Sequence, residues 1–226
     1  PHHSSEPYLA KLLKSGHKVA VCEQVEDPKS AKGVVKRKVV RVLTPGVILD
    51  SETLDSKCNN FLASVYAGNG VYGLAYTDIS TGLFRVSTFD SVEDLMDEIF
   101  RLEPKEIILE NVEEGESPVS GAALKRSGNP VITELDSWAW DTDRCRELLL
   151  EHLSAKTLEP YGLEGVPEAI TASGALLQYL KDTRLEEMPP LNDPEFYRKT
   201  GYLLIDESTK RNLELLRSNN DDSGGS

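Results

Sequence analysis

The feature that most constrains the fold is a series of three strand-like segments at residues 61–66, 71–79 and 83–89, each rich in β-branched and aromatic residues. Asn69-Gly70 separates the first two, and this pair suits the tight turn of a β-hairpin because both positions tolerate positive φ. A second turn sequence, Ser80-Thr81-Gly82, separates the last two. The pattern predicts an antiparallel meander of three strands.

Helices and strands alternate after the meander. Ser91 can cap a helix whose apolar positions (Val92, Leu95, Met96, Ile99, Phe100) form one stripe. The following segments are predicted as a strand (106–109), a short helix (119–126), a strand (131–135), a helix capped by Asp141 (to about 153) and a long helix (167–182). This order predicts an α/β fold in which helices cover a mixed sheet, and it is also the order of ribonuclease-H-like domains.

Further elements are predicted on either side of this unit. A helix over residues 6–14 precedes strands at 17–23 and 34–43, and the latter ends at Thr44-Pro45-Gly46. Beyond Pro189-Pro190, a strand at 202–205 leads into a helix at 207–217. We expect the polar, Gly/Ser-rich end of the sequence to be disordered.

The charge distribution argues against a chain that binds nucleic acid by itself. The formal net charge is −13, whereas phosphate binding relies on Lys and Arg. Residues 1–45 nevertheless hold nine Lys/Arg against four Asp/Glu, whereas residues 46–190 hold eleven against 27. The basic head is therefore the part that can approach phosphate, and the acidic middle suits a spacer or a protein-docking module.

The basic run near the end of the head is the candidate DNA-backbone site: Lys36, Arg37, Lys38 and Arg41. On a regular strand Lys36 and Lys38 would share one face, and Arg37 and Arg41 the other. A solvated strand surface is the alternative interpretation.

Enzymatic signals are few. The sequence has neither a Gly-rich phosphate loop nor a G-x-S-x-G motif, so we expect no nucleotide site and no catalytic residue in this chain. A metal-dependent nuclease remains the alternative, because Asp78 and Glu110 stand at strand ends and could converge on divalent ions. Against it, Asp78 sits at a turn, where aspartate commonly bonds the backbone.

Metal, disulfide and membrane signals are also weak. Cys22, Cys58 and Cys145 form no CxxC pair, and His2-His3 alone rarely suffices for zinc. No apolar run approaches membrane-spanning length, and no signal peptide is evident. We expect no metal, no cofactor and no membrane contact for this chain, and a reducing cytoplasm as its location.

Several stretches together resemble the MutS family of DNA mismatch repair proteins. These are PHHSSEPYLAKL (1–12), VAVCEQVEDP (19–28), RKVVRVLTPG (37–46), NNFLA (59–63), YTDISTGLF (76–84), ALLQYLKDT (175–183) and DESTKRNLEL (206–215). They occur in order and span nearly the whole chain.

The resemblance implies a division of the sequence. It gives the end of a mismatch-recognition domain (1–46), a linker (47–58), a ribonuclease-H-like connector domain without nuclease activity (59–186), the start of a core or lever domain (187–217) and a disordered tail (218–226). The absence of an initiator Met fits an internal piece of a longer protein.

The resemblance also implies partners. A full-length protein of this family, as a dimer, binds mismatched double-stranded DNA, uses ATP and Mg²⁺, recruits a MutL-type protein and associates with the nucleoid when on DNA. The mismatch wedge and the ATPase match no part of this sequence, and we expect the chain itself to be a monomer.

Overall fold

The computed structural model describes residues 6–26, 34–47, 59–112, 119, 124, 129–183 and 190–198. In chain order its elements are α1 (Glu6–Lys14), β1 (Val19–Gln24), β2 (Arg37–Leu43), β3 (Phe61–Gly68), β4 (Val71–Asp78), β5 (Leu83–Phe89), α2 (Val92–Leu102), β6 (Glu106–Glu110), β7 (Val131–Leu135), η2 (Ser137–Trp140), α4 (Thr142–Leu153), η3 (Glu159–Tyr161), α5 (Pro167–Thr183) and β8 (Glu195–Phe196).

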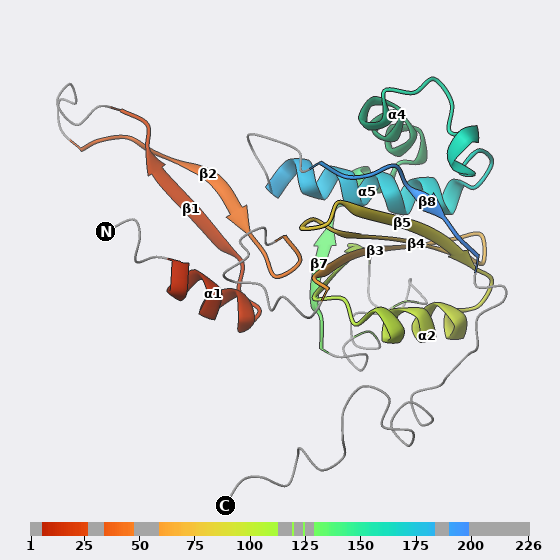
Figure 1. The fold of residues 1–226 in the computed structure, drawn as a ribbon, viewed down its shortest axis with the longest axis horizontal. Helices are drawn as coiled ribbons and strands as arrows, with labels where there is room; N and C mark the ends of the chain where they lie inside the picture. Colours follow the sequence, from red (N-terminus) through yellow and green to blue (C-terminus); the bar gives the residue numbers. More distant parts are fainter. Residues whose placement is uncertain are drawn as a thin grey trace, which may run out of the picture.

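The strands form two sheets. β1 and β2 make a two-stranded antiparallel ribbon, which extends away from the rest of the molecule in Figure 1. The other strands make a six-stranded sheet in the order β7-β6-β3-β4-β5-β8. The pairs β3–β4 and β4–β5 are antiparallel, whereas β3–β6, β6–β7 and β5–β8 are parallel. The predicted meander is therefore confirmed, and the sheet is mixed.

Helices cover both faces of the large sheet. In Figure 1, α5 and α4 lie on one side and α2 lies on the other. Leu62 of β3 faces α5, in a core that includes Trp140 and Leu176. The next residue, Ala63, faces α2 and packs with Leu95 and Ile99. This alternation along one strand places a separate apolar core on each face, as expected for a sheet buried on both sides.

Local chemistry explains where the elements begin. The Ser91 hydroxyl accepts a hydrogen bond from the Asp94 amide, and the Asp141 carboxylate accepts one from the Arg144 amide, so both predicted helix caps are confirmed. Asn69 and Gly70 have φ angles of 53° and 78°, as the tight hairpin turn requires.

None of the described helices has the length and apolar character that crossing a membrane requires.

The predicted α/β fold, with a mixed sheet flanked by helices, is confirmed. Sequence patterns did not predict η2, η3 or β8, which pairs only two residues with β5. The predicted helix at 119–126, the strand at 202–205, the helix at 207–217 and the disordered tail lie largely or wholly outside the described residues. Val47, predicted as the start of the linker, is buried in the core on the α5 face.

The packing of α4 on α5 depends on a missing side chain at Gly174. A Cβ atom there would lie 2.2 Å from Cys145 Cβ, which is far inside van der Waals contact. Gly174→Ala is therefore expected to lower the free energy of unfolding by about 1–3 kcal/mol or more, because the two helices must move apart. Urea denaturation measures this, and Glu147→Ala on the exposed face of α4 should stay within about 0.5 kcal/mol of the parent. Equal stability of the Gly174 variant and the parent would contradict this packing.

Candidate functional site at the junction of the ribbon and the sheet

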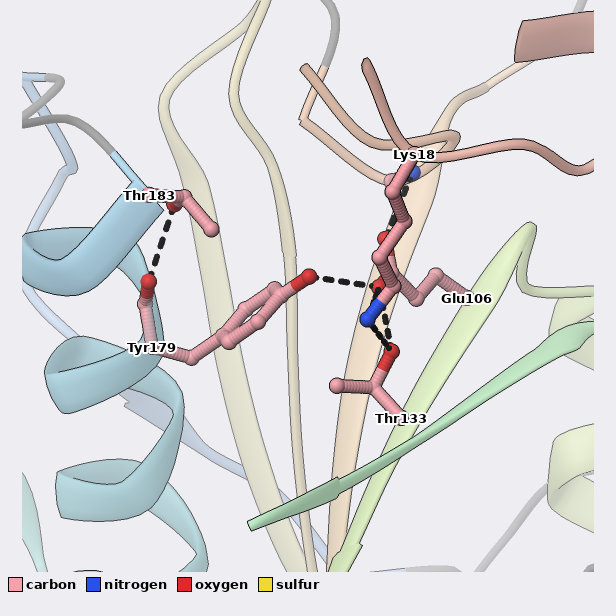
Figure 2. Close-up of polar contacts among 6 residues, drawn as sticks. Lys18, Glu106, Thr133, Tyr179 and Thr183 are labelled. Atoms are coloured by element: carbon pink, nitrogen blue, oxygen red, sulfur yellow. Dashed lines mark hydrogen bonds and ion pairs between the residues drawn. The ribbon is translucent and has the colours of Figure 1, made fainter. Parts of the chain in front are cut away.

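A buried carboxylate lies where the β1–β2 ribbon meets the large sheet. Glu106, the first residue of β6, is completely buried. Its Oε1 atom accepts hydrogen bonds from the Thr133 hydroxyl of β7 (2.5 Å) and from the Tyr179 hydroxyl of α5 (2.7 Å). Figure 2 shows the Tyr179 ring extending from its helix toward this carboxylate. One side chain thus joins two strands of the sheet to the long helix above it.

The ribbon supplies the remaining partners of this carboxylate. Lys18, immediately before β1, places Nζ 3.6 Å from Glu106 Oε1 and donates a hydrogen bond to the Thr133 hydroxyl (2.7 Å). Gly46, just after β2, donates its backbone N–H to Glu106 Oε2 (3.0 Å). The start of β1 and the end of β2 lie at the same end of the ribbon, and both therefore converge on one carboxylate of the sheet. We call Lys18, Gly46, Glu106, Thr133 and Tyr179 the junction cluster.

Gly46 can reach the carboxylate because it lacks a side chain. A Cβ atom at this position would lie 2.9 Å from both Glu106 Cβ and Leu62 Cδ1, so any larger residue would push the backbone away. The stretch from Leu43 to Val47 is buried, and the side-chain amide of Asn60 donates to the Pro45 carbonyl (3.0 Å). The end of β2 is thus packed into the sheet unit.

The donors and the ammonium of the junction cluster surround the buried carboxylate of Glu106. A buried charge is costly unless it is paired and hydrogen-bonded, and Glu106 receives three hydrogen bonds and one nearby ammonium. Burial, followed by the charge of Glu106, raises the pKa of Tyr179, so its hydroxyl keeps its proton and remains a donor. Lys18 also lies 5.5 Å from the centre of the Tyr179 ring. This arrangement is suited to holding two parts of the chain in a fixed relation.

The carboxylates considered for a nuclease site do not meet. Asp78 pairs with Phe61 at the start of β3, whereas Glu110 lies two residues beyond the Ser64–Ile108 pair. Measured along β3, the positions of Asp78 and Glu110 are therefore five residues apart, which is roughly 16 Å of extended strand. Asp78 instead accepts hydrogen bonds from the Ser80 amide and hydroxyl (3.0 and 2.6 Å). The turn role is confirmed, and among the described residues no group of three His, Cys, Asp or Glu is placed to hold a metal ion.

The basic run lies on β2 and just before it, and a bulge changes which charges share a face. Arg41 pairs with Val21, but Val39 pairs with the next residue of β1, Cys22, so β2 carries an extra residue at this point. Lys38 and Arg41 stand opposite β1 residues two apart, so they lie on one face of the ribbon. Arg37 stands opposite the next β1 residue and lies on the other face. The predicted grouping of Arg37 with Arg41 is therefore wrong, because it assumed a regular strand.

The members of the basic run also differ in their partners. Lys36 forms an ion pair with Glu26 across the ribbon (3.2 Å). Arg37, Lys38 and Arg41 are exposed. The ribbon thus presents Lys38 and Arg41 together on one face, about three residues apart along the strand.

A second surface feature lies on η2, the short helix that follows β7. Trp138 of η2 is 49% exposed although its neighbour Trp140 is buried. The Arg144 guanidinium lies 4.6 Å from the Trp138 ring centre, and Arg144 also donates to the Gln178 side chain (3.3 Å). A large aromatic ring is therefore held in place at the surface of the sheet unit by an arginine.

Sequence reasoning did not single out the junction cluster. Glu106 opens an apolar strand, and an isolated glutamate at a strand boundary normally indicates solvent exposure. Tyr179 sits within an apolar helix, where an aromatic residue indicates core packing. Only the tertiary fold brings these side chains to Lys18, which is distant in sequence from both.

Removing the charge of Glu106 tests the junction cluster. Glu106→Gln would turn an amide N–H₂ toward the Gly46 N–H or toward the two hydroxyls, and would leave at least one buried donor without an acceptor. We expect the free energy of unfolding to fall by about 1–3 kcal/mol. Chemical denaturation measures this, with Glu110→Gln at the other end of β6 as the matched control. A junction variant as stable as the control would show that the carboxylate does not hold the ribbon.

The sequence matches known protein families. Residues 60–192 match the family model described as MutS domain II, and residues 1–52 match MutS domain I. Curated relatives include proteins named DNA mismatch repair protein MutS from Desulfatibacillum aliphaticivorans (40% identity, 96% of this chain, 24% of that protein) and from Desulforapulum autotrophicum (42%, 96% and 25%). A third, from Protochlamydia amoebophila, is 35% identical over 99% of this chain and 26% of that protein.

The chain spans about a quarter of the length of these relatives. The junction cluster draws Lys18 and Gly46 from the part that matches domain I, and Glu106, Thr133 and Tyr179 from the part that matches domain II. With one model covering more than half of the sequence and relatives aligned over nearly all of it, the chain belongs to the MutS family.

Proposed function

We propose that this chain is the connector region of a MutS-type mismatch repair protein, which links the mismatch-binding part to the core and ATPase parts. The observation that carries the proposal is the junction cluster. The segment that matches domain I meets a buried carboxylate of the domain II sheet at two points: the Lys18 ammonium forms an ion pair with it, and the Gly46 backbone N–H donates a hydrogen bond to it. A displacement of the ribbon would therefore move the sheet with it, which is what a connector requires.

We further propose a ribonuclease-H-like fold without catalytic activity for the domain II segment. The order β5-β4-β3-β6-β7, with an antiparallel meander followed by parallel strands, supports this assignment. The positions of Asp78 and Glu110 at opposite ends of the sheet support the non-catalytic role. A shared fold does not by itself confer activity.

We propose that the surface around Trp138 docks a MutL-type protein. Tryptophan and arginine are the residue types that most often dominate binding energy at protein interfaces. Trp138 is half-exposed and lies beneath the Arg144 guanidinium, so it offers both a rigid apolar surface and a charge. Few other large apolar side chains of the described sheet unit are as exposed.

Trp138→Ala is expected to weaken binding of a MutL-type protein from the same organism by about 2 kcal/mol, roughly 30-fold. Isothermal titration calorimetry measures the affinity. Val112→Ala, at another exposed apolar position of the sheet unit, is the control and should bind within about twofold of the parent. Equal affinity of all three proteins would place docking elsewhere, and no binding by the folded parent would contradict the docking role.

The ribbon is the proposed point of contact with the DNA backbone. Lys38 and Arg41 share one exposed face, whereas Arg37 faces the other way and the charge of Lys36 is partly neutralised by Glu26. We propose that Lys38 and Arg41 contact phosphate when a longer protein binds mismatched double-stranded DNA, with Lys36 and Arg37 contributing less. Each phosphate contact releases counterions, so the contribution depends on salt.

The double variant Lys38→Ala/Arg41→Ala is expected to lower affinity for a labelled DNA duplex and to reduce the slope of log affinity against log salt by about 1.8, or about 0.9 for each lost contact. Fluorescence anisotropy of this chain at low salt measures both quantities, since weak binding is expected for an acidic protein. Lys36→Ala/Arg37→Ala removes the same net charge from the same ribbon and should have a smaller effect. Indistinguishable effects of the two variants would contradict a face-specific contact.

The remaining expectations concern the longer protein. We propose that such a protein is dimeric and cytoplasmic, associates with the nucleoid on DNA, and binds ATP with Mg²⁺ through a domain other than the two matched here. The chain itself is proposed to be a monomer without a cofactor. Relatives about four times its length support this division of roles.

A further inference from the structure

The segment 190–198, which we call the strap, lies along the outer edge of β5. Its backbone is held at two places: the Asn192 amide donates to the Gly82 carbonyl (2.7 Å), and the Tyr197 amide donates to the Val86 carbonyl (2.9 Å). Between them β8 pairs in parallel with β5 over two residues. In Figure 1 this short strand, in blue, is drawn beside β5. The match to MutS domain II ends at residue 192, within the strap.

The strap places consecutive side chains in both cores of the sheet unit. Leu191 and Phe196 pack against the core on the α5 face. Tyr197 packs against the core on the α2 face, where its ring meets the Tyr76 ring edge-on with centres 6.2 Å apart. The Ser87 hydroxyl of β5 donates to the Tyr197 carbonyl (2.7 Å).

The strongest single polar contact of the strap is made by the Tyr197 hydroxyl. It donates a hydrogen bond of 2.6 Å to Oε1 of Glu98, a glutamate of α2 that is only 4% exposed. Arg101 holds the same carboxylate through two nitrogen atoms (2.6 and 3.0 Å). Hydrogen bonds to an ionised group are about twice as strong as neutral ones.

The protonation of Tyr197 suits this role. Burial is the main cause that raises the pKa of Tyr197 well above its usual value, and the neighbouring Tyr76 and Glu98 raise it further. The hydroxyl therefore remains a donor throughout the physiological range of pH. Glu98 keeps its charge partner Arg101 whether or not the strap is in place, because both residues belong to α2.

The ion pair and the β-ladder of the strap are weak by comparison. Arg85 and Glu195 form an ion pair (2.9 Å), but their side chains are 39% and 60% exposed, and such surface pairs contribute little. Two paired residues are too few for an edge strand to be stable by itself. Attachment of the strap therefore depends mainly on Tyr197, whereas β3, β4, β5, β6 and β7 are held by longer ladders and by helices.

We propose that the strap is a releasable edge strand, latched to α2 by the Tyr197–Glu98 hydrogen bond, which opens as a unit while the other five strands and their helices stay folded. Opening frees the edge of β5. The strap is thus a conformational device at the side of the sheet away from the junction cluster.

Amide hydrogen exchange followed by NMR tests the proposal on this chain. In the parent, the Asn192 and Tyr197 amides should be protected, but they should exchange at least about 10-fold faster than amides at the centre of α5, with a weaker dependence on added denaturant. Tyr197→Phe removes only the hydroxyl and should speed exchange at these two amides by about 10-fold or more, while central α5 amides keep their rates. Tyr72→Phe, at another tyrosine of the same core cluster, is the control and should leave the strap unchanged.

Three results would overturn the proposal. If strap and α5 amides exchange at the same rate in the parent, with the same dependence on denaturant, the strap belongs to the global folding unit. If the strap amides show no protection in the parent, no latch exists. If Tyr197→Phe leaves the strap rates unchanged, or accelerates strap and α5 equally, the hydroxyl is not the latch. The thermal midpoint of each variant establishes that the measured protein is folded.

Discussion

The carboxylate of Glu106 is the constraint on which the arrangement of this molecule depends. A negative charge removed from water is stable only when donors surround it, and here the donors come from segments far apart in the sequence. The sheet, the long helix and the ribbon must all be in position before the carboxylate is satisfied. The ribbon and the sheet are consequently joined by a buried polar network. Loss of any one partner would leave another buried polar group without a hydrogen bond, at a cost in free energy.

The two attachments of the large sheet lie on opposite sides of it. The junction cluster holds the ribbon at β6 and β7, whereas the strap lies against β5. Between them stands a sheet buried on both faces, with α5 enclosed on nearly all sides. Such close-packed interiors deform little, so displacement at one side is passed to the other. This rigidity, together with the family of the chain, is the physical basis of the connector role proposed above.

The two attachments also differ in character. At the junction cluster a buried charge is neutralised across two parts of the chain, so separation leaves a carboxylate without partners. At the strap the carboxylate of Glu98 keeps Arg101 after Tyr197 leaves, so separation costs one charge-assisted hydrogen bond, a few neutral ones and some apolar contact, but leaves no charge without a partner. The first arrangement favours a permanent joint and the second a reversible one.

Local elements followed from the residues because short-range chemistry determines them. Ser91 and Asp141 begin helices by accepting backbone N–H groups nearby, and Asn69-Gly70 turns a hairpin through its own allowed φ angles. The turn role of Asp78 was likewise predictable, since its partner Ser80 is two residues away. The hydrogen bond that the Asn60 backbone N–H donates to the Asp78 carboxylate was not predictable, because it depends on how β3 and β4 pair.

The sequence by itself determined the meander, the alternation of helix and strand, the apolar faces and the family resemblance, all of which depend on spacing within a few residues or on ordered motifs. Only the tertiary structure decided the β2 bulge that groups Lys38 with Arg41, the short edge strand β8 and the meeting of Lys18, Glu106 and Tyr179. The physical reason is that a bulge, a two-residue edge strand and a buried ion network are stabilised by atoms distant in sequence. Their energies appear only after the chain has closed upon itself.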